Sequence, residues 1–347
     1  MTTLTAADPT SQGVTAVSAA ERSATMRAIV QEGEGSADVL HLREIARPAL
    51  ADDRVLVKVR AASVNALDWH TVHGFALLRL VATITRRKSD SPVRGVDVAG
   101  TVEAVGKDVT QFKPGDEVFG SAPAAFAEFA SARPERILIK PDNITFEQAG
   151  AVGVAGYTAL QGLRDIAQVK PCQNVLIHGA GGGVGTFSVQ IAKALGAHVT
   201  AVTGPTKVDI VRSLGADEVI DYSKGDFTKR PERYDVVFDV GATRSLGALR
   251  RVLAPGGVLV LVGADKRGGN AIFVRILLGL VRSKLFRQRI VFFVSHNDQK
   301  DLIFLKDLLQ TGRLTPRIDR TYPLSDGAEA MRYVGSGQAR AKVVLTV

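Results

Sequence analysis

Closely spaced glycines follow a short apolar run near the middle of the chain. The run Val175–Ile177 is typical of a buried parallel strand, and the glycines begin at Gly179. Apolar side chains then recur at helical spacing from Val184 to Leu195, and Gly196 ends that pattern. Such a turn lets backbone N–H groups approach a pyrophosphate at the positive end of a helix. The residues placed to do so are Ala180, Gly181, Gly182, Gly183, Val184 and Gly185, with Ala180 replacing the first glycine of the dinucleotide-binding fingerprint.

The end of the next strand indicates which dinucleotide is bound. A site that prefers NAD places Asp or Glu about 20 residues after the glycines, where it accepts hydrogen bonds from the ribose. Here Thr203, Gly204 and Lys207 occupy that stretch, and the first carboxylate is Asp209. A phosphate ester carries nearly two negative charges, so an ammonium and hydroxyls favour it. The sequence therefore predicts NADPH; the alternative is that Lys207 is a solvated residue at the start of a helix.

The composition describes a two-domain enzyme. With 347 residues and 46% hydrophobic content, the chain can bury a large core. Its single cysteine, Cys172, excludes an intrachain disulfide and a multi-cysteine zinc site, and indicates a reducing, cytoplasmic location. The net charge of +9 suits an anionic cofactor, a membrane surface or nucleic acid. We expect no nucleic-acid partner, because no nucleic-acid-binding module or Arg-rich tract accompanies the charge.

The chain divides by pattern into four stretches. Residues 1–25 are rich in Ala, Thr and Ser and are expected to form a disordered extension without a targeting signal. Residues 26–150 contain short strands separated by Gly, Pro and Asp turns, which predicts a partly closed barrel. Residues 151–297 alternate strands with helices, which predicts a doubly wound parallel sheet. Residues 298–347 end in a strand that we expect to return to the first domain.

Several segments in order resemble the medium-chain dehydrogenase/reductase superfamily, in its zinc-free quinone oxidoreductase and enoyl reductase-like branch. They are AASVNALDWH, GVDVAGTVEAVG, KPGDEVFG, GYTAL, HGAGGGVG, RSLGADEVIDY, LAPGGVLVLVG and AKVVLTV. The resemblance covers 26–347. It implies an α/β fold with a GroES-like β-rich catalytic domain and a Rossmann domain, an active site in the cleft between them, and a homodimer.

Zinc-dependent members of this superfamily carry an early cysteine and a Gly-His-Glu motif, and this chain has neither. Ser63 and Asn65 lie in the first ligand region, and Gly95, Val96 and Asp97 replace the motif. No Lewis acid would then polarise an alcohol oxygen. We therefore expect no metal and a hydride transfer to an electron-poor quinone or activated alkene. The alternatives are a zinc-free aldehyde or ketone reductase, and an NADPH-binding regulatory or structural protein with little turnover.

The resemblance also implies roles for single residues. Asn65 and Asp68 match an Asn-x-x-Asp pair at the cleft, with Asn65 near the nicotinamide ribose; Asp68 is alternatively a structural cap. Thr158 matches a nicotinamide contact, and the alternative is a hydroxyl bonded back to its own helix. The remaining cofactor positions are Lys207 and Tyr222 near the adenosine phosphate, Gly263, and Arg340 and Lys342, which flank Ala341 where the family usually has glycine.

A histidine stands where many members of the branch have tyrosine. His70 holds that place and Val72 replaces the arginine two residues later. An imidazole titrates near neutral pH, so His70 is the candidate donor of the proton that completes the reduction. The alternatives are that His70 only shapes the pocket and that solvent supplies the proton. His178 is expected to pack beside the glycine turn.

Two basic apolar segments, Ala76–Lys88 and Ile272–Phe286, are too short or too charged to span a bilayer. They are candidates for a lid over the cleft, a dimer contact or a peripheral contact with an anionic membrane. Core packing or an oligomer contact is favoured over the membrane, because apolar faces of this kind are more often packed against protein.

Overall fold

A computed structural model of the protein describes residues 24–74, 91–262 and 288–347. Gly263 and the segments Ala76–Lys88 and Ile272–Phe286 lie outside the described residues. The first strand begins at Thr25, which pairs with Ala46, so that the folded region starts one residue earlier than expected from the sequence. The rest of the expected N-terminal extension, residues 1–23, is outside the described part of the chain.

The second domain is built on a six-stranded parallel sheet in the order β10-β9-β8-β11-β12-β13. Its strands are β8 (Asn174–His178), β9 (His198–Thr203), β10 (Glu218–Asp221), β11 (Tyr234–Asp239), β12 (Leu253–Leu261) and β13 (Arg289–Phe292). Its helices are α6 (Gly183–Ala194), α7 (Val208–Ser213) and α8 (Leu246–Arg251). The strand order reverses on the two sides of β8, and ligands of such sheets bind at the carboxyl ends of the strands at this point.

The first domain is β-rich, with a seven-stranded sheet in the order β14-β15-β3-β4-β5-β7 and β6 paired with β3. Its strands are β3 (Val55–Val64), β4 (Asp97–Val105), β5 (Glu117–Ser121), β6 (Phe129–Ala132), β7 (Ile137–Ile139), β14 (Ile318–Pro323) and β15 (Lys342–Thr346). A separate hairpin consists of β1 (Thr25–Gln31) and β2 (Leu40–Ala46). Because β15 pairs with β3, the end of the chain returns to the sheet of the first domain. The predicted fold class, an α/β chain with a β-rich domain and a parallel Rossmann-type sheet, is confirmed.

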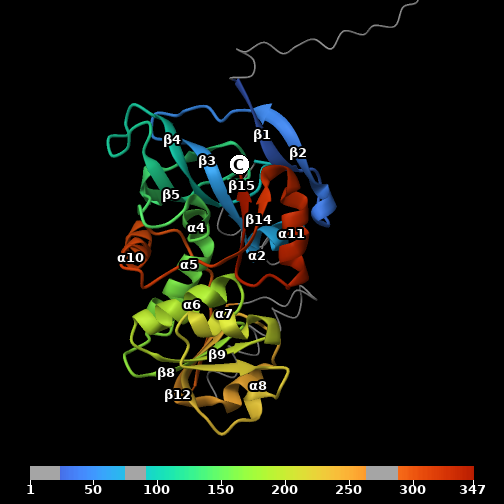
Figure 1. The fold of residues 1–347 in the computed structure, drawn as a ribbon, viewed down its shortest axis with the longest axis vertical. Helices are drawn as coiled ribbons and strands as arrows, with labels where there is room; N and C mark the ends of the chain where they lie inside the picture. The colour runs from blue at the N-terminus through green and yellow to red at the C-terminus, as the bar shows by residue number, and fades with distance from the viewer. Residues whose placement is uncertain (1–23, 75–90, 263–287) are drawn as a thin grey trace, which may run out of the picture.

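Helices connect the two sheets. In Figure 1, α4 (Phe146–Gly150) and α5 (Gly153–Leu160) lie between the β-rich domain and the parallel sheet. One apolar core is shared: it contains Phe119 of β5, Val175 of β8 and Leu305 of α10 (Gln299–Gln310). The helices α2 (Ala66–Val72) and α11 (Gly327–Ser336) pack together on the β-rich side. A continuous core of this kind fixes the two domains against each other and so fixes the residues at their junction.

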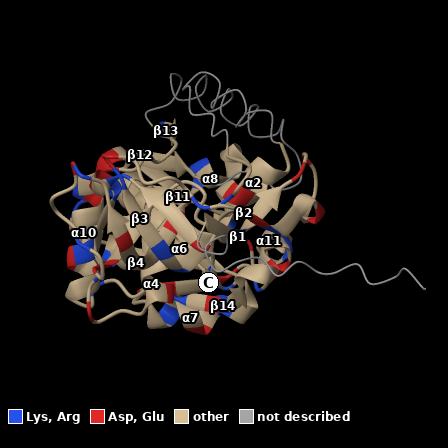
Figure 2. Ribbon diagram, turned by 90° about the horizontal axis from the view of Figure 1, so that it is seen from above, with Lys and Arg blue, Asp and Glu red and all other residues tan. Residues whose placement is uncertain are grey.

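Basic and acidic residues occur together on α10 and beside it, as the view from above shows (Figure 2). Within this helix, Lys300 is followed by Asp301 and Lys306 by Asp307. None of the helices that the structure describes is long and apolar enough to cross a membrane.

Candidate functional site

The glycine turn lies between β8 and α6. Gly179 has a positive φ of +87°, and Gly182 begins α6 without a side-chain cap. A Cβ atom on Gly185 would lie 2.2 Å from the Gly179 carbonyl oxygen, so only glycine allows helix and strand to approach this closely. The first turn of a helix has N–H groups without intrahelical partners. The uncapped start of α6 therefore fits the pyrophosphate of a dinucleotide.

Five residues predicted from the sequence meet at the carboxyl end of β9. A Cβ atom on Gly181 would lie 2.6 Å from Thr203 Oγ1 and 2.7 Å from the side chain of Lys207. A Cβ atom on Gly204 would lie 2.8 Å from the hydroxyl of Tyr222, whose side chain is half-exposed. Hydroxyls and a cation thus surround the turn, and they form a donor set suited to a phosphate ester.

Lys207 is partly buried rather than solvated. Its Nζ donates to the carbonyl oxygen of Ala339 at 2.6 Å. Burial lowers the pKa of Lys207; the neighbouring Arg340 also lowers it, whereas Asp319 raises it. The exposed Arg340 is held through its backbone N–H by Asp319 at 2.8 Å. Two cations, Lys207 and Arg340, therefore lie near the end of β9, although they are far apart in the sequence.

Asp97 is the centre of a buried polar cluster on the β-rich side. Its side chain is fully buried, and Oδ2 accepts hydrogen bonds from Ser63 Oγ at 2.6 Å and from Asn65 Nδ2 at 2.9 Å. Its Oδ1 accepts from the backbone N–H of Val154 at 2.7 Å, at the start of α5. The sequence drew attention to Asp97 only as the last residue of the segment that replaces the Gly-His-Glu motif; the structure shows that it organises this cluster.

Lys342 joins the two halves of the site. Its Nζ donates to Asn65 Oδ1 at 2.6 Å and lies 3.6 Å from Asp97 Oδ2. A Cβ atom on Gly183 would lie 3.3 Å from Lys342 Cδ, so the lysine stem passes beside the glycine turn. Burial lowers the pKa of Lys342, against the raising effects of Asp97 and Asp68. Asn65 and the start of α6 are thus held in one arrangement.

Asp68 caps α2. Its Oδ2 accepts from the backbone N–H of Asn65 at 2.8 Å, which is the structural role left open by the sequence. Burial raises the pKa of Asp68 to about 7, although the hydrogen bond from Asn65 acts to lower it. His70 is buried on the same helix, with its ring edge-on to Trp69 at 5.1 Å between centroids.

Thr158 has the back-bonded hydroxyl that the sequence left as an alternative. Its Oγ1 donates to the Val154 carbonyl oxygen at 2.6 Å and lies 2.9 Å from Ser295 Oγ. His178 closes the other side of the glycine turn, with Nδ1 2.7 Å from Asp239 Oδ1 and Nε2 3.2 Å from Thr243 Oγ1. Ser295 carries no motif in the sequence, because its contact with Thr158 joins residues 137 positions apart.

Within the described ranges, His, Cys, Asp and Glu side chains form no cluster of three that could hold a metal ion. The oxygens of Asp97 are committed to protein donors, and the positive charge next to them is the ammonium of Lys342. Cys172 is exposed. The donor set at the former ligand positions therefore does not fit a zinc ion, which binds imidazole, thiolate and carboxylate ligands in tetrahedral geometry.

Two family profiles match the chain. The alcohol dehydrogenase GroES-like domain matches residues 51–162, and the zinc-binding dehydrogenase family matches residues 214–345.

Characterised relatives match over nearly the whole length. The 2-methylene-furan-3-one reductase of Solanum lycopersicum is 34% identical over 90% of this chain and 76% of its own. The chloroplastic NADPH-dependent alkenal/one oxidoreductase of Arabidopsis thaliana is 34% identical over 92% of this chain and 79% of its own. Among solved structures, the quinone oxidoreductase from Coxiella burnetii superposes with a TM-score of 0.79 at 30% identity, covering 93% of this chain and 99% of that chain.

Proposed function

Because the chain belongs to the medium-chain dehydrogenase/reductase superfamily and is an NAD(P)H oxidoreductase, we propose that it transfers a hydride from NADPH to a quinone or an activated alkene without a metal ion. The observation that carries the choice of cofactor is the group at the end of β9. Lys207, Tyr222 and Thr203 surround Gly181 and Gly204 there. A 2′-phosphate would find a cation and hydroxyls at this place, and the stretch 203–208, where an NAD-preferring site carries Asp or Glu, holds no acidic residue.

The acceptor class is proposed from the relatives and from the donor set. The names of the two plant enzymes specify an enone and an alkenal or alkenone, and that of the Coxiella burnetii protein specifies a quinone. Each of these acceptors is already electron-poor and accepts a hydride at carbon or oxygen without a Lewis acid. The saturated hydrogen bonds of Asp97 support a reaction without zinc.

The residues of this chain would act by binding and positioning. Backbone N–H groups of Gly183, Val184 and Gly185 would bind the pyrophosphate. Asn65 would hold the nicotinamide ribose, because Lys342 fixes the side-chain amide of Asn65 by a hydrogen bond. When bound, the reduced nicotinamide supplies the hydride. One proton must then reach the α-carbon of an enone or the oxygen of a quinone. We propose His70 as its donor, with solvent as the competing source.

The test of the cofactor assignment is the variant Lys207→Ala. We expect affinity for NADPH to fall about 10- to 100-fold, as for the loss of a hydrogen bond to a charged group, and affinity for NADH to change little. Calorimetric dissociation constants for both cofactors measure this.

Lys193→Ala is a matched control, because Lys193 is also partly buried and also donates to a backbone carbonyl oxygen, that of Ala197, at 3.2 Å. It lies at the far end of α6 and should leave both affinities unchanged. Equal losses for NADPH and NADH in Lys207→Ala would contradict the 2′-phosphate assignment.

A further inference from the structure

A π-helix follows α5 beside the proposed nicotinamide site. It spans Gln161–Ile166 and is marked by the bond from Ala167 N–H to the Gly162 carbonyl oxygen, five residues back, at 3.0 Å. Turns of this kind are frequently found at functional sites. Its first residue, Gln161, has a buried side chain that is 3% exposed. Because it is buried, the amide of Gln161 must find its hydrogen-bond partners within the protein.

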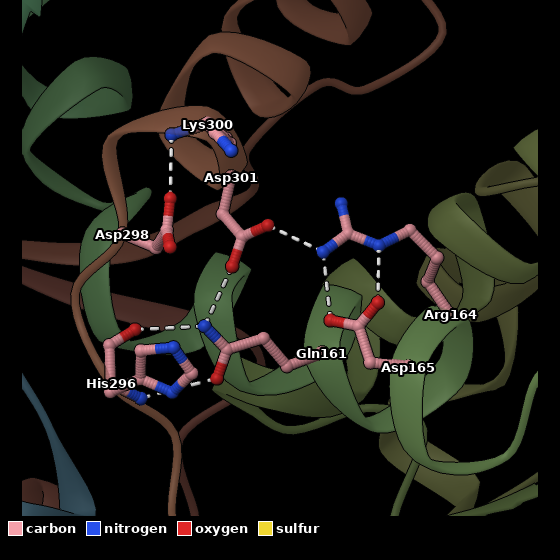
Figure 3. Close-up of polar contacts among 7 residues, drawn as sticks. All are labelled: Gln161, Arg164, Asp165, His296, Asp298, Lys300 and Asp301. Carbon is pink, nitrogen blue, oxygen red and sulfur yellow. Dashed lines mark hydrogen bonds and ion pairs between the residues drawn. The ribbon is translucent and has the colours of Figure 1, made fainter.

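The amide of Gln161 binds the backbone of a distant loop. Its Oε1 accepts from the His296 N–H at 3.1 Å, and its Nε2 donates to the His296 carbonyl oxygen at 2.8 Å. The second hydrogen of Nε2 donates to Asp301 Oδ2 at 2.7 Å. Figure 3 shows both contacts, with the side chain of Gln161 reaching from the π-helix to the loop before α10. The amide pairs with His296 as a neighbouring strand would.

The surrounding charges fix the orientation of this amide. The carboxylate of Asp301 also pairs with Arg164 of the π-helix, which binds Asp165 through two hydrogen bonds (Figure 3). Since Asp301 and the His296 carbonyl oxygen are both acceptors, only the NH2 group of Gln161 can face them. The loop 293–298 is therefore held in one register against α5.

That register places Ser295 against Thr158. The Thr158 hydroxyl donates its hydrogen to the Val154 carbonyl oxygen, which is only an acceptor. The 2.9 Å contact between the two hydroxyls must then use the hydrogen of Ser295. With that hydrogen directed to Thr158, the Ser295 oxygen can only accept further hydrogen bonds. The Ser295 oxygen is thus a hydrogen-bond acceptor. It suits the carboxamide of a nicotinamide, because that group has N–H donors.

We infer that Ser295 accepts a hydrogen bond from the nicotinamide carboxamide and that Gln161 is the positioning residue that holds Ser295 in place. This inference rests on the proposed function, because it deepens the cofactor assignment. It is tested by binding alone, with NADP⁺ and with its 3-acetylpyridine analogue, in which a methyl group replaces the carboxamide NH2.

The unaltered chain should bind NADP⁺ about 5- to 10-fold more tightly than the analogue, the value of one net hydrogen bond. The variants Gln161→Met and Ser295→Ala should each lose most of this preference, and the double variant should lose no more than either. Such non-additivity is the signature of two residues that act through one contact. Titration calorimetry gives the dissociation constants of NADP⁺ and of the analogue for the unaltered full-length chain, the two single variants and the double variant.

Gln190→Met is the matched control. Gln190 is also buried, and its amide also pairs with a backbone: Oε1 accepts from Thr315 N–H at 2.8 Å and Nε2 donates to the Thr315 carbonyl oxygen at 3.2 Å. This control should keep the preference for NADP⁺.

A retained preference in Gln161→Met or Ser295→Ala would overturn the inference, and so would an equal loss in Gln190→Met. Binding of NADP⁺ without any preference in the unaltered chain would refute the carboxamide contact alone. A lack of NADP⁺ binding by that chain would refute the proposed function and this inference together.

Discussion

The carboxyl group of Asp68 gives the buried cluster a measurable dependence on pH. It accepts a hydrogen bond from the Asn65 N–H at 2.8 Å but has almost no contact with water, being 5% exposed. Burial raises its pKa from 3.8 to about 7. The variant Asp68→Asn keeps an oxygen that can accept from Asn65 and removes the charge that burial disfavours.

The folded-state pKa lies above the unfolded one, so the native protein binds this proton more tightly than the unfolded chain does. The stability that the protonated carboxyl contributes is fully present below about pH 4 and is lost as the pH rises through about 7. The slope within this window is about 1.4 kcal/mol per pH unit. Between pH 5 and pH 8, the free energy of unfolding of Asp68→Asn should therefore rise by about 2 to 3 kcal/mol relative to that of the unaltered chain.

Urea unfolding of both proteins at several pH values measures this difference. Asp38→Asn serves as the control, because hydrogen bonds from Ser36 and Arg332 lower the pKa of Asp38, which stays ionised over the same range. The free energy of unfolding of Asp38→Asn should change with pH in the same way as that of the unaltered chain. Parallel curves for Asp68→Asn, or a loss of its relative stability as the pH rises, would refute the argument from burial.

Two further substitutions test separate parts of the site. Ala341 has a φ of +129°, which L-residues rarely adopt. Ala341→Gly should therefore raise the free energy of unfolding, measured in urea, by about 1 kcal/mol, whereas the control Ala339→Gly should lower it. A lower free energy of unfolding in Ala341→Gly would show that the position is not strained. His70→Gln should reduce kcat for an enone about 100-fold or more if the imidazole is the proton donor. Stopped-flow oxidation of NADPH measures this, and an unchanged kcat would assign the proton to solvent.

The parts of the site that the sequence predicted are those made by neighbouring residues. The glycine turn from Gly179 to Gly185 lies within a single strand-turn-helix unit, so its spacing alone specifies its backbone. The parallel sheet follows from alternating strands and helices in the same way. Lys207 and Tyr222 lie beside the turn because they follow the ends of two adjacent strands, β9 and β10; their contact with the cofactor stays a prediction.

The parts that it did not predict depend on contacts between distant segments. The partners of Asp97 come from β3, the start of α2 and α5, and Ser295 meets Thr158 in a loop that the buried amide of Gln161 binds. A buried glutamine and a loop serine have no sequence pattern that distinguishes them from exposed ones. The positive φ of Ala341 was likewise hidden, although the glycine usual in the family at that place was a signal of it.

The most direct test of the proposed activity is oxidation of NADPH and NADH, followed by nicotinamide absorbance, against a benzoquinone, a naphthoquinone, a 2-enone and an aldehyde, with and without a metal chelator. We predict turnover of a quinone or the enone that prefers NADPH and is unaffected by the chelator. Turnover that the chelator abolishes, or that is confined to the aldehyde, would contradict the proposal.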